Sequence, residues 1–166
     1  MRYSDCDAGS AWPAELLVRC LSGHRAAGHR IVFTNGCFDV LHHGHVRCLR
    51  QAAAHGDVLV VAVNSDDGIR KLKGPGRPLN PAADRAAVLA AIGCVDYVTI
   101  FEEDTPAALV AAIRPDVYAK GGDYDVGSLP EGRLVAGYGG CVVTAGYLPG
   151  RSTTRLIEKM KGSPAR

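Results

Sequence analysis

Residues 34–45 read TNGCFDVLHHGH, and they join the apolar run Arg30–Thr34 to a helical pattern over Gly44–His55. A short run of β-branched residues followed at once by an amphipathic segment is typical of the strand-to-helix junction in a βαβ unit. The pattern H-x-G-H, His42 to His45, lies where that helix begins. This junction predicts both the type of fold and the place of a binding site.

Phosphate is the ligand that this junction is best suited to bind. The start of a helix has unpaired N–H groups and a partial positive charge, and both attract anions. Gly44 has no side chain, so the backbone can come close to a bound group. His42 and His45 are three residues apart, so they share one face of the first turn and can both donate to phosphate oxygens.

The three histidines allow two other interpretations. They could bind a metal ion, but a zinc site needs further Cys or His ligands close in space. Histidines at a helix start are also often ordinary polar residues. Their position where a strand becomes a helix favours phosphate binding. His43, at the variable position of the pattern, is interpreted as an incidental surface residue.

Further apolar runs predict strands, and the segments between them predict helices. The expected strands, besides Arg30–Thr34, are Asp57–Val63, Val95–Phe101, Asp116–Ala119 and Cys141–Thr144. The expected helices, besides Gly44–His55, are Trp12–Arg25, Pro81–Ile92 with Asn80 as N-cap, Thr105–Ile113, and Thr153–Met160 capped by Ser152. The sequence therefore predicts an α/β fold, a Rossmann-like three-layer α/β/α domain with a parallel five-stranded sheet.

Two segments are expected to be loops, Ile69–Leu79, which mixes Gly, Pro and basic residues, and the glycine-rich segment Gly121–Gly140. In an open α/β sheet, ligands bind beyond the carboxyl ends of the strands. The loops that follow Thr34, Val63 and Ala119 are therefore expected to surround one crevice.

The composition is that of an ordinary globular domain, with 166 residues of which 47% are hydrophobic and 22% charged. We expect a helical N-terminal extension over residues 1–27 and one domain over residues 28–166. The net charge is only +2 and the basic residues are scattered, which argues against nucleic-acid or acidic-membrane partners. No apolar stretch reaches the ~20 residues of a membrane span. Six cysteines without a C-x-x-C pair, and no secretory signal, predict reduced thiols in a cytoplasmic protein.

Two common nucleotide-binding motifs are absent, the P-loop G-x-x-x-x-G-K-[ST] and the fingerprint G-x-G-x-x-G after the first strand. The segment TNGCFDVLHHGH resembles the nucleotidyltransferase superfamily that includes glycerol-3-phosphate and phosphocholine cytidylyltransferases. A further set of ordered segments is similar to the heptose 1-phosphate adenylyltransferases, namely Ala62–Asp66, Leu72–Gly74, Arg77–Pro78, Asn80–Pro81, Arg85, Phe101–Pro106, Lys120–Tyr124 and Gly150–Thr154. The resemblance covers Gly28–Lys161. In many relatives this domain follows a sugar kinase, whereas here it is expected to stand alone.

One segment departs from the cytidylyltransferase pattern. Those enzymes usually carry R-T-x-G-I-S-T-T before the last helix, whereas residues 147–154 here read YLPGRSTT. Tyr147 stands in place of the first arginine and Arg151 directly precedes Ser152, which counts against a cytidylyltransferase. Residues 121–123 read GGD and also differ from the more acidic GDD of those relatives.

The resemblance implies a reaction in which D-glycero-D-manno-heptose 1-phosphate attacks the α-phosphorus of ATP, giving ADP-heptose and pyrophosphate, with Mg²⁺ on the phosphates. A phosphate monoester has its second pKa at about 6, so it is already anionic near neutral pH and needs no general base. A homodimer is also expected from the family. Two alternatives stay open. One is a cytidylyltransferase for glycerol 3-phosphate or another small phosphate monoester, and the other is a nucleotide-binding module without catalysis.

Site residues follow from matching these segments to the family. Those expected to act in catalysis are His42, His45 and Lys73. Those expected to bind the nucleotide and its phosphates are Asn35, Gly36, Cys37, Phe38, Gly44, Lys71, Gly122, Asp123, Arg151, Ser152, Thr153 and Thr154. Those expected to bind the sugar phosphate are Asp39, Asn64, Asp66, Arg77 and Arg85, with Asp39 also a candidate for Mg²⁺. Simpler interpretations are a solvated basic loop for Lys71 and Lys73, a surface residue for Arg85, and helix capping for residues 152–154.

Overall fold

Five parallel strands form one sheet in the order β3-β2-β1-β4-β5 in the computed structural model, which describes residues 11–121, 130–146, 153–160 and 162. The strands are β1 (Ile31–Gly36), β2 (Val58–Asn64), β3 (Tyr97–Phe101), β4 (Val117–Gly121) and β5 (Cys141–Ala145). Each expected strand lies where the apolar pattern placed it, and every neighbouring pair is parallel. The predicted α/β fold class is confirmed.

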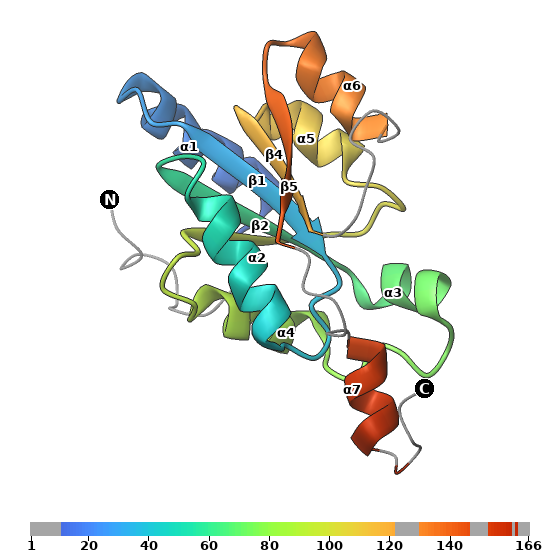
Figure 1. The fold of residues 1–166 in the computed structure, drawn as a ribbon. Coiled ribbons are helices and arrows are strands. Elements are labelled where there is room, and N and C mark those ends of the chain that lie inside the picture. Colours follow the sequence, from blue (N-terminus) through green and yellow to red (C-terminus); the bar gives the residue numbers. More distant parts are fainter. Residues whose placement is uncertain (1–10, 122–129, 147–152, 161, 163–166) are drawn as a thin grey trace.

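Helices cover both faces of this sheet (Figure 1). One face packs against α1 (Ala14–Ala26), α5 (Ala107–Ile113) and α6 (Pro130–Gly137). The other face packs against α2 (His43–Ala53) and α4 (Ala82–Ala90). Two further helices, α3 (Asp66–Lys73) and α7 (Thr153–Met160), lie beyond the carboxyl ends of the strands, and Figure 1 shows them at the same end of the molecule.

Strand β2 shows why the strands could be recognised from the sequence. Val58, Val60 and Ala62 belong to the core cluster under α1 and α5, whereas the residues between them belong to the cluster under α2 and α4. Every residue of β2 is buried, so the strand has a continuous apolar run rather than an alternating one. Leu17 and Leu21 of α1 are buried in the first of these clusters. The boundary proposed after residue 27 stays a prediction.

Both expected loops contain a helix, so these two predictions are wrong in part. Residues 66–73 form α3, and Ser65 is its N-cap. The Ser65 Oγ accepts a hydrogen bond from the Gly68 N–H at 3.1 Å. Lys71 and Lys73 lie in the last turn of α3, where a positive charge is favourable beside the negative end of the helix dipole. Within Gly121–Gly140, residues 130–137 form α6.

The expected N-cap of α4 is also corrected. Pro81 occupies the cap position, and Asn80 turns its side chain away to donate from Nδ2 to the Asp39 carbonyl at 2.8 Å. The Asn80 amide therefore bonds to the backbone that follows β1 and does not cap α4. The predicted cap of α7, Ser152, lies outside the described residues.

The strand order reverses beside β1, which pairs with β2 on one side and with β4 on the other. The chain leaves β1 toward α2 on one face and reaches β4 from α5 on the opposite face. A crevice at the carboxyl ends of such strands is the usual binding place in this type of sheet. Across the ranges described, no helix has the length and apolar character that a membrane span requires.

Candidate active site

A cavity of about 500 Å³ opens at the carboxyl ends of the central strands. The predicted site residues that line it are Asn35, Gly36, Cys37, Phe38, His45, Asn64, Lys73 and Thr153. They come from β1, β2, α2, α3 and α7, so five separate elements meet at the place where the sheet order reverses. The structure thus brings residues predicted for both substrates into one space.

The histidines of the H-x-G-H pattern are fixed by a reciprocal cap at the start of α2. The Gly44 N–H donates to Nδ1 of His42 at 3.1 Å, and the His42 N–H donates to Nδ1 of His45 at 3.3 Å. The two rings are stacked, with 3.9 Å between their centroids. Because Nδ1 of each ring accepts a hydrogen bond, each neutral ring carries its proton on Nε2. Both imidazoles can therefore donate from Nε2.

His45 is kept neutral by its surroundings. Burial, together with the nearby charges of His42 and Lys73, lowers the pKa of His45 from 6.5 to about 4. The ring of Phe38 packs against it, with 5.4 Å between the two centroids. A Cβ on Gly36 would lie 3.0 Å from that phenyl ring, so glycine leaves the room that Phe38 needs. Near pH 7, His45 is a hydrogen-bond donor without a charge.

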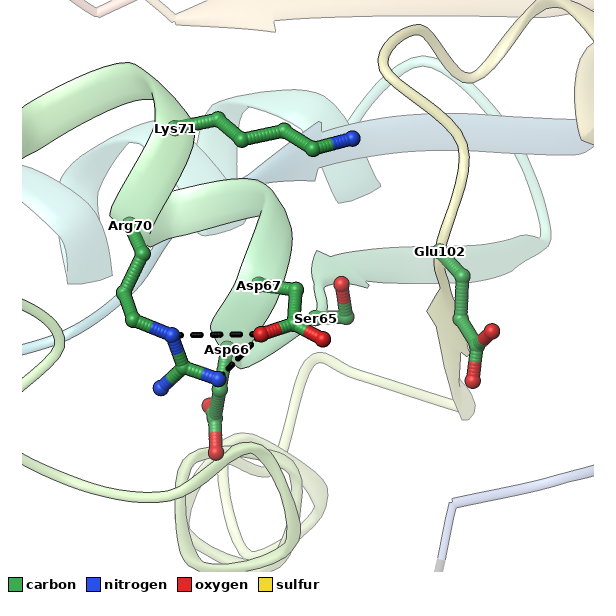
Figure 2. A pocket seen from close by; sticks show the side chains of 6 residues that line it. All are labelled: Ser65, Asp66, Asp67, Arg70, Lys71 and Glu102. Carbon is green, nitrogen blue, oxygen red and sulfur yellow. Dashed lines mark hydrogen bonds and ion pairs between the residues drawn. The ribbon is translucent and has the colours of Figure 1, made fainter.

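The two lysines of α3 lie in different places. Lys73 lines the cavity, whereas Lys71 donates to the Asp104 carboxylate at 2.9 Å, which raises the pKa of Lys71. Lys71 lines a neighbouring polar pocket of about 440 Å³ instead. Figure 2 shows that pocket, with Lys71 on α3, Glu102 just past β3, and an ion pair between Arg70 and Asp67. Of these two lysines, Lys73 is the one that lines the cavity with His45.

Arg85 is buried inside the fold and is not a surface residue, since only 2% of it is exposed. Its guanidinium donates to the carbonyl oxygens of Cys37 at 2.6 Å and Asn64 at 2.8 Å. It also donates to the Asn80 carbonyl at 2.9 Å and to the Asp66 carboxylate at 2.7 Å. Arg85 and Asp66 thus tie the ends of β1 and β2 to the start of α4, and neither residue lines the cavity.

Asp39 and Arg77 likewise face each other and do not line the cavity. The Asp39 carboxylate accepts from the Arg77 guanidinium and from the backbone N–H groups of Leu79, at 2.7 Å, and Asn80, at 3.1 Å. Burial acts to raise the pKa of Asp39, but these hydrogen bonds outweigh it and hold the pKa below its ordinary value. Asp39 therefore anchors residues 77–80 beside β1.

Three charged residues of the cavity, Asp104, Lys120 and Glu131, were missed as site residues by sequence reasoning. Asp104 follows β3, Lys120 lies near the end of β4, and Glu131 lies in the first turn of α6. Lys120 lay in a segment quoted for the family resemblance, whereas α6 was expected to be a loop and Glu131 carried no signal.

The start of α7 reaches the same region. Thr153 Oγ1 donates to the Val40 carbonyl at 3.2 Å, which joins α7 to the segment after β1. Thr154 is exposed. The remaining predicted residues Gly122, Asp123, Arg151 and Ser152 lie outside the described residues.

A family model described as cytidylyltransferase-like matches residues 33–146, which include β1 from Phe33 onward, the H-x-G-H segment and the other four strands of the sheet. The chain belongs to the cytidylyltransferase-like family. The superfamily resemblance drawn from residues 34–45 is thereby confirmed. In this family member, the matched residues contain nearly all of the cavity lining described above.

Curated relatives of this cytidylyltransferase-like chain carry the name bifunctional protein HldE. That of Pelobacter propionicus is 49% identical over 160 residues, covering 96% of this chain and 33% of the relative. That of Alcanivorax borkumensis is 50% identical over 148 residues, covering 89% and 31%. The chain thus spans about a third of the length of the curated relatives it matches. A lipopolysaccharide core biosynthesis protein from Thermoplasma volcanium has a similar crystal structure, with a TM-score of 0.61, 27% identity, and coverage of 73% of this chain and 100% of that one.

Proposed function

We propose that this chain transfers AMP from ATP to D-glycero-D-manno-heptose 1-phosphate and releases pyrophosphate. The observation that carries the proposal is the capped pair His42 and His45 at the start of α2, with His45 and Lys73 lining one cavity. Membership of the cytidylyltransferase-like family supports nucleotidyl transfer. The heptose substrate is supported by the ordered segments that resemble heptose 1-phosphate adenylyltransferases and by relatives named HldE.

The chemistry requires positioning and charge stabilisation more than proton transfer. An oxygen of the sugar phosphate forms a bond to the α-phosphorus of ATP, and the bond from that phosphorus to the oxygen bridging to the β-phosphorus breaks. Pyrophosphate leaves with the electron pair. The Nε2–H groups of the two histidines, the Lys73 ammonium and the start of α2 can all donate to the phosphate oxygens on which charge develops. No carboxylate base is needed.

Mg²⁺ is part of the proposal as the partner of the triphosphate. Mg²⁺ usually binds one or two carboxylates together with substrate phosphates and water. Two carboxylates, Asp104 and Glu131, line the cavity and fit that donor set; Asp104 accepts from Lys71 through one oxygen but stays largely exposed. Asp39 fits less well, because its oxygens already accept hydrogen bonds from Arg77 and the backbone. Bound there, the ion would neutralise charge on the phosphates.

The proposal also keeps the expected homodimer, with ATP and the heptose phosphate as partners and with neither nucleic acid nor membrane involved. The net charge of +2 supports that last point. Light scattering of the purified chain after size-exclusion chromatography tests the dimer, for which a mass near the 17.5 kDa of one chain would be the contradicting result.

A substrate matrix tests the reaction itself. Pyrophosphate release is measured with ATP, CTP, GTP and UTP, each combined with heptose 1-phosphate, glycerol 3-phosphate and glucose 1-phosphate. We expect turnover with ATP and heptose 1-phosphate above all other pairs. Turnover with CTP and glycerol 3-phosphate alone would support the cytidylyltransferase alternative instead. Binding of ATP without turnover on any phosphate would support a non-catalytic module.

The pH dependence of kcat/KM is expected to reflect protonation of the sugar phosphate and not of His45. Burial favours the neutral ring, so His45 takes up a proton only near pH 4, well below its ordinary pKa of 6.5. The sugar phosphate gains a proton below its second pKa of about 6 and then becomes a poorer nucleophile. We expect kcat/KM to fall as the pH drops below about 6, and the NMR signal of the His45 ring to titrate near pH 4. A ring that titrates close to 6.5 would contradict this.

A further inference from the structure

The amide of Asn35 is held by two residues of the neighbouring strand. Asn35 lies near the end of β1 and lines the cavity. Its Oδ1 accepts a hydrogen bond from the Tyr118 hydroxyl at 2.7 Å and another from Lys120 Nζ at 3.1 Å. Both donors belong to β4, so these contacts cross the point where the strand order reverses.

The direction of these hydrogen bonds follows from the chemistry of the groups. An ammonium group only donates, and Lys120 Nζ also lies 3.3 Å from the Tyr118 hydroxyl. That hydroxyl accepts from Lys120 and gives its own proton to Asn35 Oδ1. The oxygen end of the amide is therefore turned toward β4, and the two N–H groups of Nδ2 are turned away from it.

The Nδ2 group of Asn35 makes no hydrogen bond to any part of the chain that the structure describes. We infer that Tyr118 and Lys120 are positioning residues, which hold the Asn35 amide so that Nδ2 donates to a phosphate oxygen of the nucleotide. The inference rests on the proposed function for the identity of the ligand. It favours the nucleotide over the sugar phosphate, because the donors lie on the β4 side of β1 whereas Asn64, assigned to the sugar phosphate, ends β2 on the other side.

Lys120 is half-buried, and the partial desolvation of its ammonium has a free-energy cost that this role would explain. Burial lowers the pKa of Lys120, and the charge of Glu131 acts in the opposite direction. Both side chains line the cavity, so Glu131 partly compensates the ammonium close to the place where the phosphates would bind. A side chain desolvated in this way is retained more readily if its hydrogen bonds fix the orientation of a ligand-binding group.

Binding of the α,β-methylene analogues of ATP and CTP, measured by calorimetry on the full chain, tests this inference without turnover. Tyr118→Phe is expected to weaken binding of the analogue that the wild type prefers by about 10-fold, the effect of one hydrogen bond to a charged group. Tyr138→Phe is the matched control. The Tyr138 hydroxyl is buried and has no hydrogen-bond partner among the described residues, so binding should change by less than about twofold.

A double-mutant cycle separates positioning from a general structural effect. In an Asn35→Ala background, Tyr118→Phe should change binding by less than about twofold, because both substitutions act through one amide. Lys120→Met keeps the aliphatic stem and should reproduce the loss, which covers the case of a poorly folded Tyr118→Phe. An equal loss in both backgrounds would overturn the inference, as would full binding in Tyr118→Phe and Lys120→Met.

Two further outcomes separate this inference from the proposed function. Wild type that prefers the CTP analogue would contradict ATP as the substrate, while a loss in the variants would still support the role of Tyr118 and Lys120. Weaker binding of glucose 1-phosphate with unchanged binding of the nucleotide analogue would overturn the assignment of Asn35 to the nucleotide. Wild type that binds neither analogue would contradict both proposals.

Discussion

His45→Ala is expected to lower kcat at least ~100-fold in the reaction of ATP with heptose 1-phosphate. His45 lines the cavity, is neutral near pH 7, and carries its proton on Nε2 because Nδ1 accepts from the His42 N–H. In the proposed reaction, its removal takes away a fixed donor to the phosphates on which charge develops. Since such a donor acts mainly in the transition state, kcat should fall more than KM rises.

His43→Ala is the matched control for this experiment. His43 lies in the same turn of α2 but is exposed, and the structure gives it no contact within the cavity lining. Its substitution should leave kcat within about twofold of wild type, since exposed positions contribute little. If His45→Ala kept most of the activity, or if both variants lost it equally, the assignment of the histidines would be wrong.

Arg85→Met is expected to lower the free energy of unfolding by about 3 kcal/mol, since it removes a buried guanidinium that donates to four acceptors. The substitution leaves the carbonyl oxygens of Cys37 and Asn64 without their donor and separates Asp66 from its ion-pair partner. Each buried acceptor left unsatisfied costs about 1–3 kcal/mol. In a chain of this length, the loss corresponds to a melting temperature lower by roughly 6–12 °C.

Arg47→Met is the matched control, which separates the effect of losing buried hydrogen bonds from the effect of losing one positive charge. Arg47 is exposed on α2, so its loss changes the net charge by the same amount without removing a buried hydrogen bond. Urea unfolding of both variants followed by circular dichroism should show a large shift of the midpoint for Arg85→Met only. A small shift for Arg85→Met, with nucleotide or sugar-phosphate binding strongly reduced, would instead favour its predicted contact with the sugar phosphate.

The strands and the strand-to-helix junction that carries H-x-G-H could be predicted because their signals are local. A strand buried on both faces needs a continuous apolar run, as β2 has, and H-x-G-H places both histidines in one turn of α2. The two missed helices lacked such signals. The sequence of α3 is rich in charged residues and is followed by Gly74, and α6 contains two glycines, so local propensity predicted loops where tertiary contacts stabilise helices.

From the sequence alone came the parallel α/β architecture and the placement of His42 and His45 in one turn at the start of a helix, because hydrophobic periodicity and close spacing are properties of the chain itself. The assignment of Lys73 came from the family resemblance. Only the tertiary structure showed that Arg85 is buried among carbonyl oxygens and that Asn35 meets Tyr118 and Lys120. These last contacts join residues 83 and 85 positions apart, and no local pattern records which distant groups will share a buried hydrogen bond. Tyr118 and Lys120 reach Asn35 only because β4 pairs with β1 in the folded sheet.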